Sequence, residues 1–346
     1  VISVWSVGND MKKNRQQTVT IIGDGGWGTA LALVLHRNGH GVTVWGPFED
    51  YLAEVRKRRE NRKFLPGVRL PKDIRWVADR EQAVNQANVV VLAIPSRYFR
   101  GVVESFSEFI PRDALVVSVT KGVEKSTGKR MTEVAGELLR HGPVAALSGP
   151  SLATEVARGI PSAVTIACEN HARALALQRV FNNPSFRVYT SDDVVGAELG
   201  GALKNVIAIA AGVCDGIGYG DNTKAALITR GLAEIARLGI ALGAHPITFA
   251  GLSGMGDLVV TCTSRHSRNR SVGERLGRGE RIGAILKGME QVAEGVWTCI
   301  SAREVAHKNK IQVPITEEVY AVIHKGKDPR KAVQALLTRE PKPERD

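Results

Sequence analysis

Short runs of apolar and β-branched residues mark the first part of the chain, up to about residue 190. The runs span four to seven residues, and most end at a glycine, a proline or a polar side chain, which is typical of buried strands in a parallel sheet. Apolar residues at helical spacing fill several of the segments between them. The predicted strands are Thr18–Ile22, Gly41–Trp45 and residues 89–95, 114–119, 144–147, 163–167 and 186–189. Alternating strands and helices predict a doubly wound α/β sheet, which binds ligands at the carboxyl ends of its strands.

The pattern changes after Asp192. Strand-like runs become rare, and glycines separate segments with apolar residues at helical spacing. This change predicts a second domain that is all helical, and a chain of 346 residues is long enough for two cores. The predicted division is a disordered extension at 1–17, a sheet domain at 18–192, a helical domain at 193–338 and a tail at 339–346.

The first helix of the second domain is predicted over residues 196–212, and it is small or apolar on nearly every face, so we expect it in the interior. It contains Lys204. A buried ammonium loses hydration and therefore needs a carboxylate partner or a lowered pKa, either of which suits proton transfer. Gly200 and Gly201, one turn earlier, leave room for another group to approach. The alternative is a structural lysine whose amine reaches water along its own stem.

The first predicted strand leads into a glycine-rich turn, GDGGWG, and then into an apolar helix. Strand, GxGxxG and helix in this order form the dinucleotide-binding fingerprint. In such a turn Gly23 makes the tight bend, Gly25 lets the backbone approach a pyrophosphate, and Gly28 lets the helix pack on the strand. The turn therefore predicts a bound NAD or NADP.

The sequence after the second strand leaves the choice between NAD and NADP open. An NAD site normally carries Asp or Glu there, and an NADP site carries arginine. This chain has Gly46 and Pro47 instead, while Glu49 and Asp50 come slightly late. Two arginines, Arg37 and Arg56, are candidate phosphate partners without a firm placement.

Composition limits the classes of protein. The chain is 43% hydrophobic and 24% charged, as in a typical folded globular protein. The net charge is +12, but the positive residues are spread along the chain and aromatics make up only 5%, so we do not expect a nucleic-acid partner. A basic balance fits an anionic small ligand equally well. The longest apolar runs are too short to span a bilayer, so no membrane insertion is expected.

Four cysteines lie far apart in the sequence, at Cys168, Cys214, Cys262 and Cys299. They form no CxxC motif or His–Cys cluster, which argues against a zinc site or a disulfide framework and for a reducing compartment. We therefore expect no metal and a cytoplasmic location. The first residues lack the apolar core and cleavage site of a secretory signal. Met11 is a candidate start of translation, which leaves open whether residues 1–10 belong to the native protein.

Several polar residues at strand ends and in loops are candidates for catalytic or ligand-binding roles. Lys121 follows the predicted strand 114–119 and is a candidate to reach a carbonyl or phosphate oxygen. Asp257, in the loop GLSGMGDL, is a candidate partner for Lys204 or an N-cap for the next segment. The basic stretch SRHSRNR precedes Ser271 and Glu274, which fit a capping box for the following helix. A basic loop at a helix N-terminus is a candidate phosphate site, although most charge runs are solvated surface.

As a set, a series of motifs resembles the bacterial NAD(P)-dependent glycerol-3-phosphate dehydrogenases. The motifs are GDGGWGTALA, FLPGVRLP, VTKGVE, LSGPS, GGALKNVIAIAAG, ALITRGLAE, GLSGMGDLVVTCTS, SRNR and VPITEE, and they extend from about residue 18 to about residue 337. The resemblance implies a Rossmann-like domain followed by an all-helical one, with the site in the cleft between them.

The resemblance also implies roles for individual residues. It makes Lys204 the general acid/base, gives Lys121 contacts to substrate and cofactor, and lets Asp257 support the catalytic lysine. Substrate positions are Lys121, Gly149, Ser151, Lys204, Asp257, Ser267, Arg268 and Asn269. Cofactor positions are Gly23, Gly25, Gly26, Trp27, Gly28, Pro47, Lys121, Ala153, Arg268, Val292 and Glu294. This chain departs from the family at Gly26, where relatives carry serine or alanine, and at Gly46 and Pro47, where they often carry arginine or histidine.

The reaction implied is the reversible NAD(P)H-dependent reduction of dihydroxyacetone phosphate to sn-glycerol 3-phosphate for glycerophospholipid synthesis. Two alternatives are a related β-hydroxyacid or 6-phosphogluconate-type dehydrogenase and a dinucleotide-binding redox sensor without enzymatic activity. The SRNR motif and the LKNV context around Lys204 favour glycerol phosphate over the first. Dimers are common in the family, so a homodimer is a candidate assembly.

Overall fold

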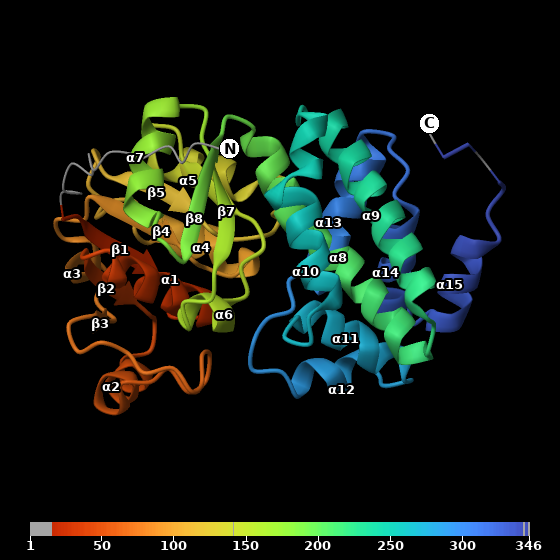
Figure 1. The fold of residues 1–346 in the computed structure, drawn as a ribbon, viewed down its shortest axis with the longest axis horizontal. Coiled ribbons are helices and arrows are strands. Elements are labelled where there is room, and N and C mark those ends of the chain that lie inside the picture. Colours follow the sequence, from red (N-terminus) through yellow and green to blue (C-terminus); the bar gives the residue numbers. More distant parts are fainter. Residues whose placement is uncertain (1–15, 141, 342, 345–346) are drawn as a thin grey trace, which may run out of the picture.

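The computed structural model describes residues 16–140, 142–341 and 343–344. The prediction of an extension at 1–17 thus falls almost wholly outside the described residues, as does the question of residues 1–10. Two lobes lie side by side, a sheet with flanking helices and a bundle of helices (Figure 1). The described chain enters the sheet lobe first and passes into the helical lobe after residue 191.

The sheet lobe is built on eight strands in the order β3-β2-β1-β4-β5-β6-β7-β8. Neighbours are parallel except for β6 and β7, which pair antiparallel. The strands are β1 (Thr18–Ile22), β2 (Gly41–Trp45), β3 (Arg75–Val77), β4 (Val89–Leu92), β5 (Leu115–Ser118), β6 (Ala145–Ser148), β7 (Ser162–Ala167) and β8 (Phe186–Ser191). The predicted Rossmann-like sheet is confirmed, and β3 is a short strand that the sequence analysis missed.

Helices cover both faces of this sheet because alternate residues of the buried strands point to opposite sides. In β1, for example, Val19 and Ile21 join one apolar cluster and Ile22 joins the other. The first cluster includes residues of α1 (Gly26–Arg37), α2 (Glu49–Arg58), α6 (Ala153–Ala157) and α7 (His171–Phe181). The second includes residues of α3 (Arg80–Val84), α4 (Phe99–Glu104) and α5 (Met131–Leu139).

The helical lobe is organised around α8 (Val194–Ile217), which runs through its middle (Figure 1). By length and composition α8 could cross a membrane, which corrects the expectation that every apolar stretch is too short. Its apolar window is 89% buried inside the protein, so it is the core helix that the sequence predicted. The other helices are α9 (Asp221–Ala241), α10 (Asp257–Thr263), α11 (Arg268–Gly277), α12 (Ile282–Lys287), α13 (Gly295–Lys308), α14 (Pro314–Lys325) and α15 (Pro329–Leu337).

Glycines on α8 and α11 bring these two helices into unusually close contact. A Cβ atom at Gly212 would collide with the carbonyl oxygen of Arg270, and one at Gly273 would collide with that of Ile209. The close approach places the N-terminus of α11 beside the middle of α8. The capping box predicted at Ser271 and Glu274 is wrong. The N-cap of α11 is Ser267, whose hydroxyl accepts a hydrogen bond from the Arg270 amide at 3.3 Å.

Candidate functional site

The glycine-rich turn between β1 and α1 has the geometry expected of a dinucleotide-binding loop. Gly23 has a φ of +125°, a backbone conformation that side chains disfavour. A Cβ at Gly28 would collide with the Gly23 carbonyl, so helix and strand need this glycine to pack. At Gly25, by contrast, no atom of the described chain beyond the adjacent residues Asp24 and Gly26 lies within 4 Å of the Cβ position. The turn therefore leaves open space at the N-terminus of α1, as a bound pyrophosphate would require.

The surroundings of residue 26 explain why a glycine stands at this position. A Cβ at this position would lie 2.5 Å from the carbonyl oxygen of Phe64, closer than real Cβ contacts. The same carbonyl accepts a hydrogen bond at 3.1 Å from the side chain of Gln291, which belongs to the helical lobe. The segment around Phe64 thus lies over the turn and leaves no room for a side chain at residue 26.

Lys204 lies on the buried face of α8, with only 6% of its surface exposed. Its ammonium forms an ion pair with Oδ1 of Asp257 and donates at 2.7 Å to the hydroxyl of Thr261. Asp257 is 1% exposed and is the first residue of α10, so the N-cap interpretation of this residue is wrong. Thr261 follows one turn later on α10 and donates back to the Asp257 carbonyl at 2.6 Å. The lysine is thereby held in one position.

The electrostatic surroundings give Lys204 a pKa of about 7. Burial is the largest cause, because it disfavours the charged form. The carboxylate of Asp257 raises the pKa, and the nearby charge of Lys121 lowers it. Both the ammonium and the neutral amine are therefore accessible near neutral pH, which suits a group that donates and accepts a proton.

Lys121 reaches the same carboxylate from the other lobe. It lies beyond the end of β5, and its ammonium is 2.6 Å from Oδ2 of Asp257. It also donates at 3.0 Å to the carbonyl oxygen of Gly149, which follows β6. Gly201 makes this approach feasible, since a Cβ there would lie 3.4 Å from Lys121 Cγ and 2.6 Å from the Ser148 hydroxyl. One buried carboxylate thus joins two lysines from different lobes.

The start of α11 brings several other predicted residues together. Asn269 is buried, donates to the side chain of Asn205 at 2.9 Å and accepts from the Gly295 amide at 2.9 Å. Arg268 is exposed and donates to the carbonyl of Val292 at 2.9 Å. The next arginine along, Arg270, is already paired with carboxylates of Asp215 and Glu274.

Glu294 links the helical lobe to the end of β4. Its carboxylate accepts from the Ser96 amide at 3.0 Å and from the Ser96 hydroxyl at 2.5 Å. Burial raises the pKa of Glu294, and the hydrogen bonds from Ser96 oppose that shift. The family resemblance predicted Glu294 as a cofactor position, but nothing in the local sequence could pair it with Ser96, 198 positions away.

The remaining predicted residues lie around this cluster. Ser151 donates to the Gly149 carbonyl at 2.9 Å, and Gly149 has a φ of +138°. Ala153 is the first residue of α6, which packs against α1. Trp27 is half-buried in the first turn of α1, and Pro47 is exposed after β2.

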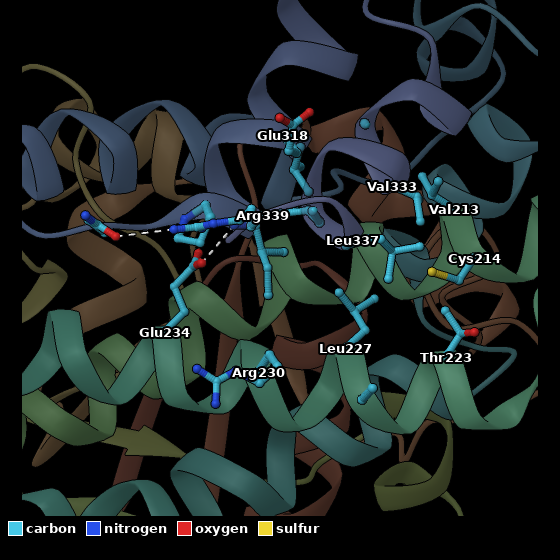
Figure 2. A pocket seen from close by; sticks show the side chains of 18 of the residues that line it. Val213, Cys214, Thr223, Leu227, Arg230, Glu234, Glu318, Val333, Leu337 and Arg339 are labelled. Atoms are coloured by element: carbon cyan, nitrogen blue, oxygen red, sulfur yellow. Dashed lines mark hydrogen bonds between the residues drawn. The ribbon is translucent and has the colours of Figure 1, made fainter. Parts of the chain in front are cut away.

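A cavity of about 790 Å³ lies in the helical lobe, apart from all of these residues, between α8, α9, α14 and α15. Figure 2 shows apolar side chains such as Val213, Leu227 and Leu337 around it. Its buried Glu234 accepts from the Ile315 and Thr316 amides at 2.8 and 2.9 Å, so this carboxylate caps α14. The cavity therefore adds nothing to the ionic cluster around Asp257.

Comparison with known proteins identifies the family. The model of the NAD-dependent glycerol-3-phosphate dehydrogenase N-terminus matches residues 18–174, and that of the C-terminus matches residues 193–334. The chain belongs to this family. It is 48% identical to the glycerol-3-phosphate dehydrogenase [NAD(P)+] of Geobacillus kaustophilus, over 95% of this chain and 97% of that one. It is 46% identical to the enzyme of the same name from Fusobacterium nucleatum, over 94% and 97% of the two chains.

Solved structures of this dehydrogenase family agree with the fold. The glycerol-3-phosphate dehydrogenase of Coxiella burnetii superposes with a TM-score of 0.91 at 38% identity and covers 94% of this chain and 99% of that one. The enzyme from Saccharomyces cerevisiae has a TM-score of 0.78 at 27% identity, over 92% and 99%. A ketopantoate reductase from Ralstonia eutropha, at 18% identity and a TM-score of 0.59, shares the fold alone.

Proposed function

We propose that this oxidoreductase reduces dihydroxyacetone phosphate to sn-glycerol 3-phosphate with Lys204 as the general acid, and runs the reverse reaction with the neutral amine as base. The observation that carries the mechanism is the buried Lys204–Asp257–Lys121 cluster, in which the pKa of Lys204 is about 7. The cluster lies where the two lobes meet, since Lys121 comes from the sheet lobe and the other two residues from the helical lobe.

Proton transfer follows from the position of Lys204. When bound, NAD(P)H would supply the hydride for the carbonyl carbon of the substrate. As negative charge develops on the carbonyl oxygen, the Lys204 ammonium gives that oxygen a proton and becomes a neutral amine. In the reverse direction the neutral amine removes the proton of the hydroxyl group. Thr261 and Asp257 keep the Nζ atom in one place through both directions.

The net charge of the cluster supports this step. Two ammonium groups share one carboxylate, which leaves one positive charge uncompensated when both lysines are protonated. Positive charge fixed near the reacting oxygen stabilises the developing alkoxide without reorganisation of solvent. Lys121 supplies that charge from the end of β5, while its bond to the Gly149 carbonyl holds it in place.

The N-terminus of α11 is proposed to bind the substrate phosphate. Ser267 and Arg268 lie at its first turn, where amide dipoles favour an anion, and Arg268 is an exposed residue there. Binding energy from the phosphate would position the reacting carbon beside Lys204. Asn269 connects this terminus to α8 through Asn205, the residue directly after Lys204.

The cofactor is proposed to lie along the glycine turn, with its pyrophosphate at Gly25. The remaining cofactor roles predicted for Trp27, Pro47, Ala153, Val292 and Glu294 are part of the same proposal. The proposal also includes the division into domains at 192/193, a cytoplasmic location and assembly as a homodimer. It includes no nucleic-acid partner. The family assignment supports these assignments, and glycerol phosphate for phospholipid synthesis is the expected product.

The reaction is tested by the absorbance of reduced nicotinamide in the presence of purified protein and dihydroxyacetone phosphate. Rapid loss of absorbance is expected with the phosphorylated ketone, and little loss with unphosphorylated dihydroxyacetone at the same concentration. Equal rates with both ketones, or tight cofactor binding with no turnover on either, would contradict the proposal and favour a hydroxyacid dehydrogenase or a sensor.

Replacement of Arg268 by alanine is expected to raise KM for dihydroxyacetone phosphate by about tenfold or more, with a much smaller change in the dissociation constant for cofactor. The reason is that the substrate phosphate would lose its charge-assisted contact with the Arg268 guanidinium. The matched control is Arg265→Ala, which removes an exposed arginine from the same basic loop. Equal weakening of substrate and cofactor in Arg268→Ala would mean that the phosphate has been misplaced.

A further inference from the structure

Asp24 is a half-buried acidic residue that has no role in the proposed proton transfer. It is the second residue of the glycine turn, and its Oδ2 atom is buried with no hydrogen-bond partner among the described residues. Burial raises the pKa of Asp24, while a bond from its own amide and the charge of Lys63 oppose that shift. A buried carboxylate oxygen without a donor is costly, so a donor from a bound ligand would be stabilising.

The Asp24 carboxylate lies at the end of β2, in space that another side chain would otherwise take. If Gly46 carried a Cβ, that atom would lie 2.6 Å from Asp24 Oδ2 and 2.7 Å from Asp24 Cγ. Gly46 directly follows Trp45, the last residue of β2. The position after β2 is where dinucleotide sites place the residue that meets the adenosine ribose. In this chain the side chain is missing at that position, and a carboxylate from the turn occupies its space.

The turn holds Asp24 in place. The side-chain amide of Asn61 donates to the Asp24 carbonyl at 2.7 Å and to the Thr29 hydroxyl at 2.7 Å. Asn61 is fully buried, and its own carbonyl accepts from the Phe64 amide at 3.2 Å. These bonds fix the backbone of Asp24, so only the side-chain torsion angles lose freedom when its carboxylate accepts a hydrogen bond.

We propose that Asp24 selects NAD(H) over NADP(H) by accepting hydrogen bonds from the adenosine ribose hydroxyls, in place of the acidic residue that usually follows β2. The same carboxylate would repel a 2′-phosphate. This proposal depends on the proposed function only because both assume that a dinucleotide binds at the glycine turn. The two acidic residues that follow β2 are less suitable: Glu49 is paired with Arg56, and Asp50 is exposed at the start of α2.

The test measures dissociation constants of the full chain for NADH and NADPH, without substrate, from nicotinamide fluorescence. The unmodified protein is expected to bind NADH at least about tenfold more tightly than NADPH, the size of one charge-assisted hydrogen bond. Asp24→Asn keeps the shape of the side chain and removes its charge. It is expected to weaken the binding of NADH by about tenfold and to reduce the preference for NADH over NADPH. Displacement by 5′-AMP and by adenosine 2′,5′-bisphosphate should show the same preference and the same loss.

Two further variants keep the test sharp. Asp50→Asn is the matched control, because it removes an exposed carboxylate near the same strand end, and the preference for NADH should not change. The double variant Asp24→Ala with Gly46→Arg fills the vacated space with a cation and should favour NADPH. An unmodified protein that binds both cofactors equally, or an Asp24→Asn variant with an unaltered ratio, would overturn the proposal. Neither result would bear on reduction of dihydroxyacetone phosphate, which the substrate assay tests separately.

Discussion

Lys204→Ala is expected to lower kcat for reduction of dihydroxyacetone phosphate by about 10²- to 10⁴-fold, the range of a lost general acid. The dissociation constant for the reduced cofactor should stay close to its original value, because the glycine turn lies in the other lobe and does not involve Lys204. Steady-state absorbance gives kcat, and nicotinamide fluorescence gives cofactor binding. Together they separate a loss of chemistry from a loss of folding.

A matched control and a rescue experiment narrow the interpretation of that variant. Lys308→Ala removes an exposed lysine at the end of α13 and should retain full activity. Added methylamine should restore part of the Lys204→Ala rate, since a small amine can replace the lost group in the space that it leaves. A variant that keeps more than about a hundredth of the original rate would rule out Lys204 as the general acid.

The parts of the fold that sequence predicted best are those whose causes are local. The strands Thr18–Ile22 and Gly41–Trp45 have the predicted bounds because glycines mark their ends. The GxGxxG turn is recognisable because Gly23 and Gly28 each meet a steric demand of the turn itself. Burial of Lys204 was predictable for the same reason, since small and apolar residues surround it on its own helix.

Prediction was weaker where distant segments decide the structure. The helix predicted over 196–212 extends over Val194–Ile217, because the Asp193 side chain caps it by accepting from the Gly196 amide at 2.7 Å. Gly212 does not end the helix, because that glycine is needed where α11 approaches. The strand Arg75–Val77 has only three residues, too few to show a pattern.

In the candidate site, too, features set by local sequence were predictable and features set by distant segments were not. Asp257 was a candidate partner for Lys204, but its second bond, to Lys121, joins residues 136 positions apart and depends on how the two lobes meet. Thr261 was missed, although its spacing from Asp257 puts both on one face of a helix, a signal that local sequence does carry. Ser96 and Asp24 depend on contacts with Glu294 and Gly46 that no local pattern specifies.

Asp257→Asn is expected to lower the rate of reduction at pH 7 by about one to three orders of magnitude, because it removes the negative charge between two ammonium groups. The pKa of Lys204, about 7 in the intact cluster, should fall by about one to three units without that charge. Reduction needs the ammonium form, so its rate falls as pH rises through the pKa of Lys204. In the variant that fall should occur at lower pH.

The oxidation of glycerol 3-phosphate distinguishes this electrostatic role from a structural one. Oxidation needs the neutral amine, which is present above the pKa, so Asp257→Asn should impair it much less than reduction at pH 7. Thr261→Val is the matched comparison, since it removes a hydrogen bond to Lys204 without changing the charge of the cluster. Its pH profiles should therefore stay close to those of the unmodified enzyme. Equal loss in both directions, with no displacement of either profile, would show that Asp257 only holds α10 against α8, and that Lys204 is tuned by burial alone.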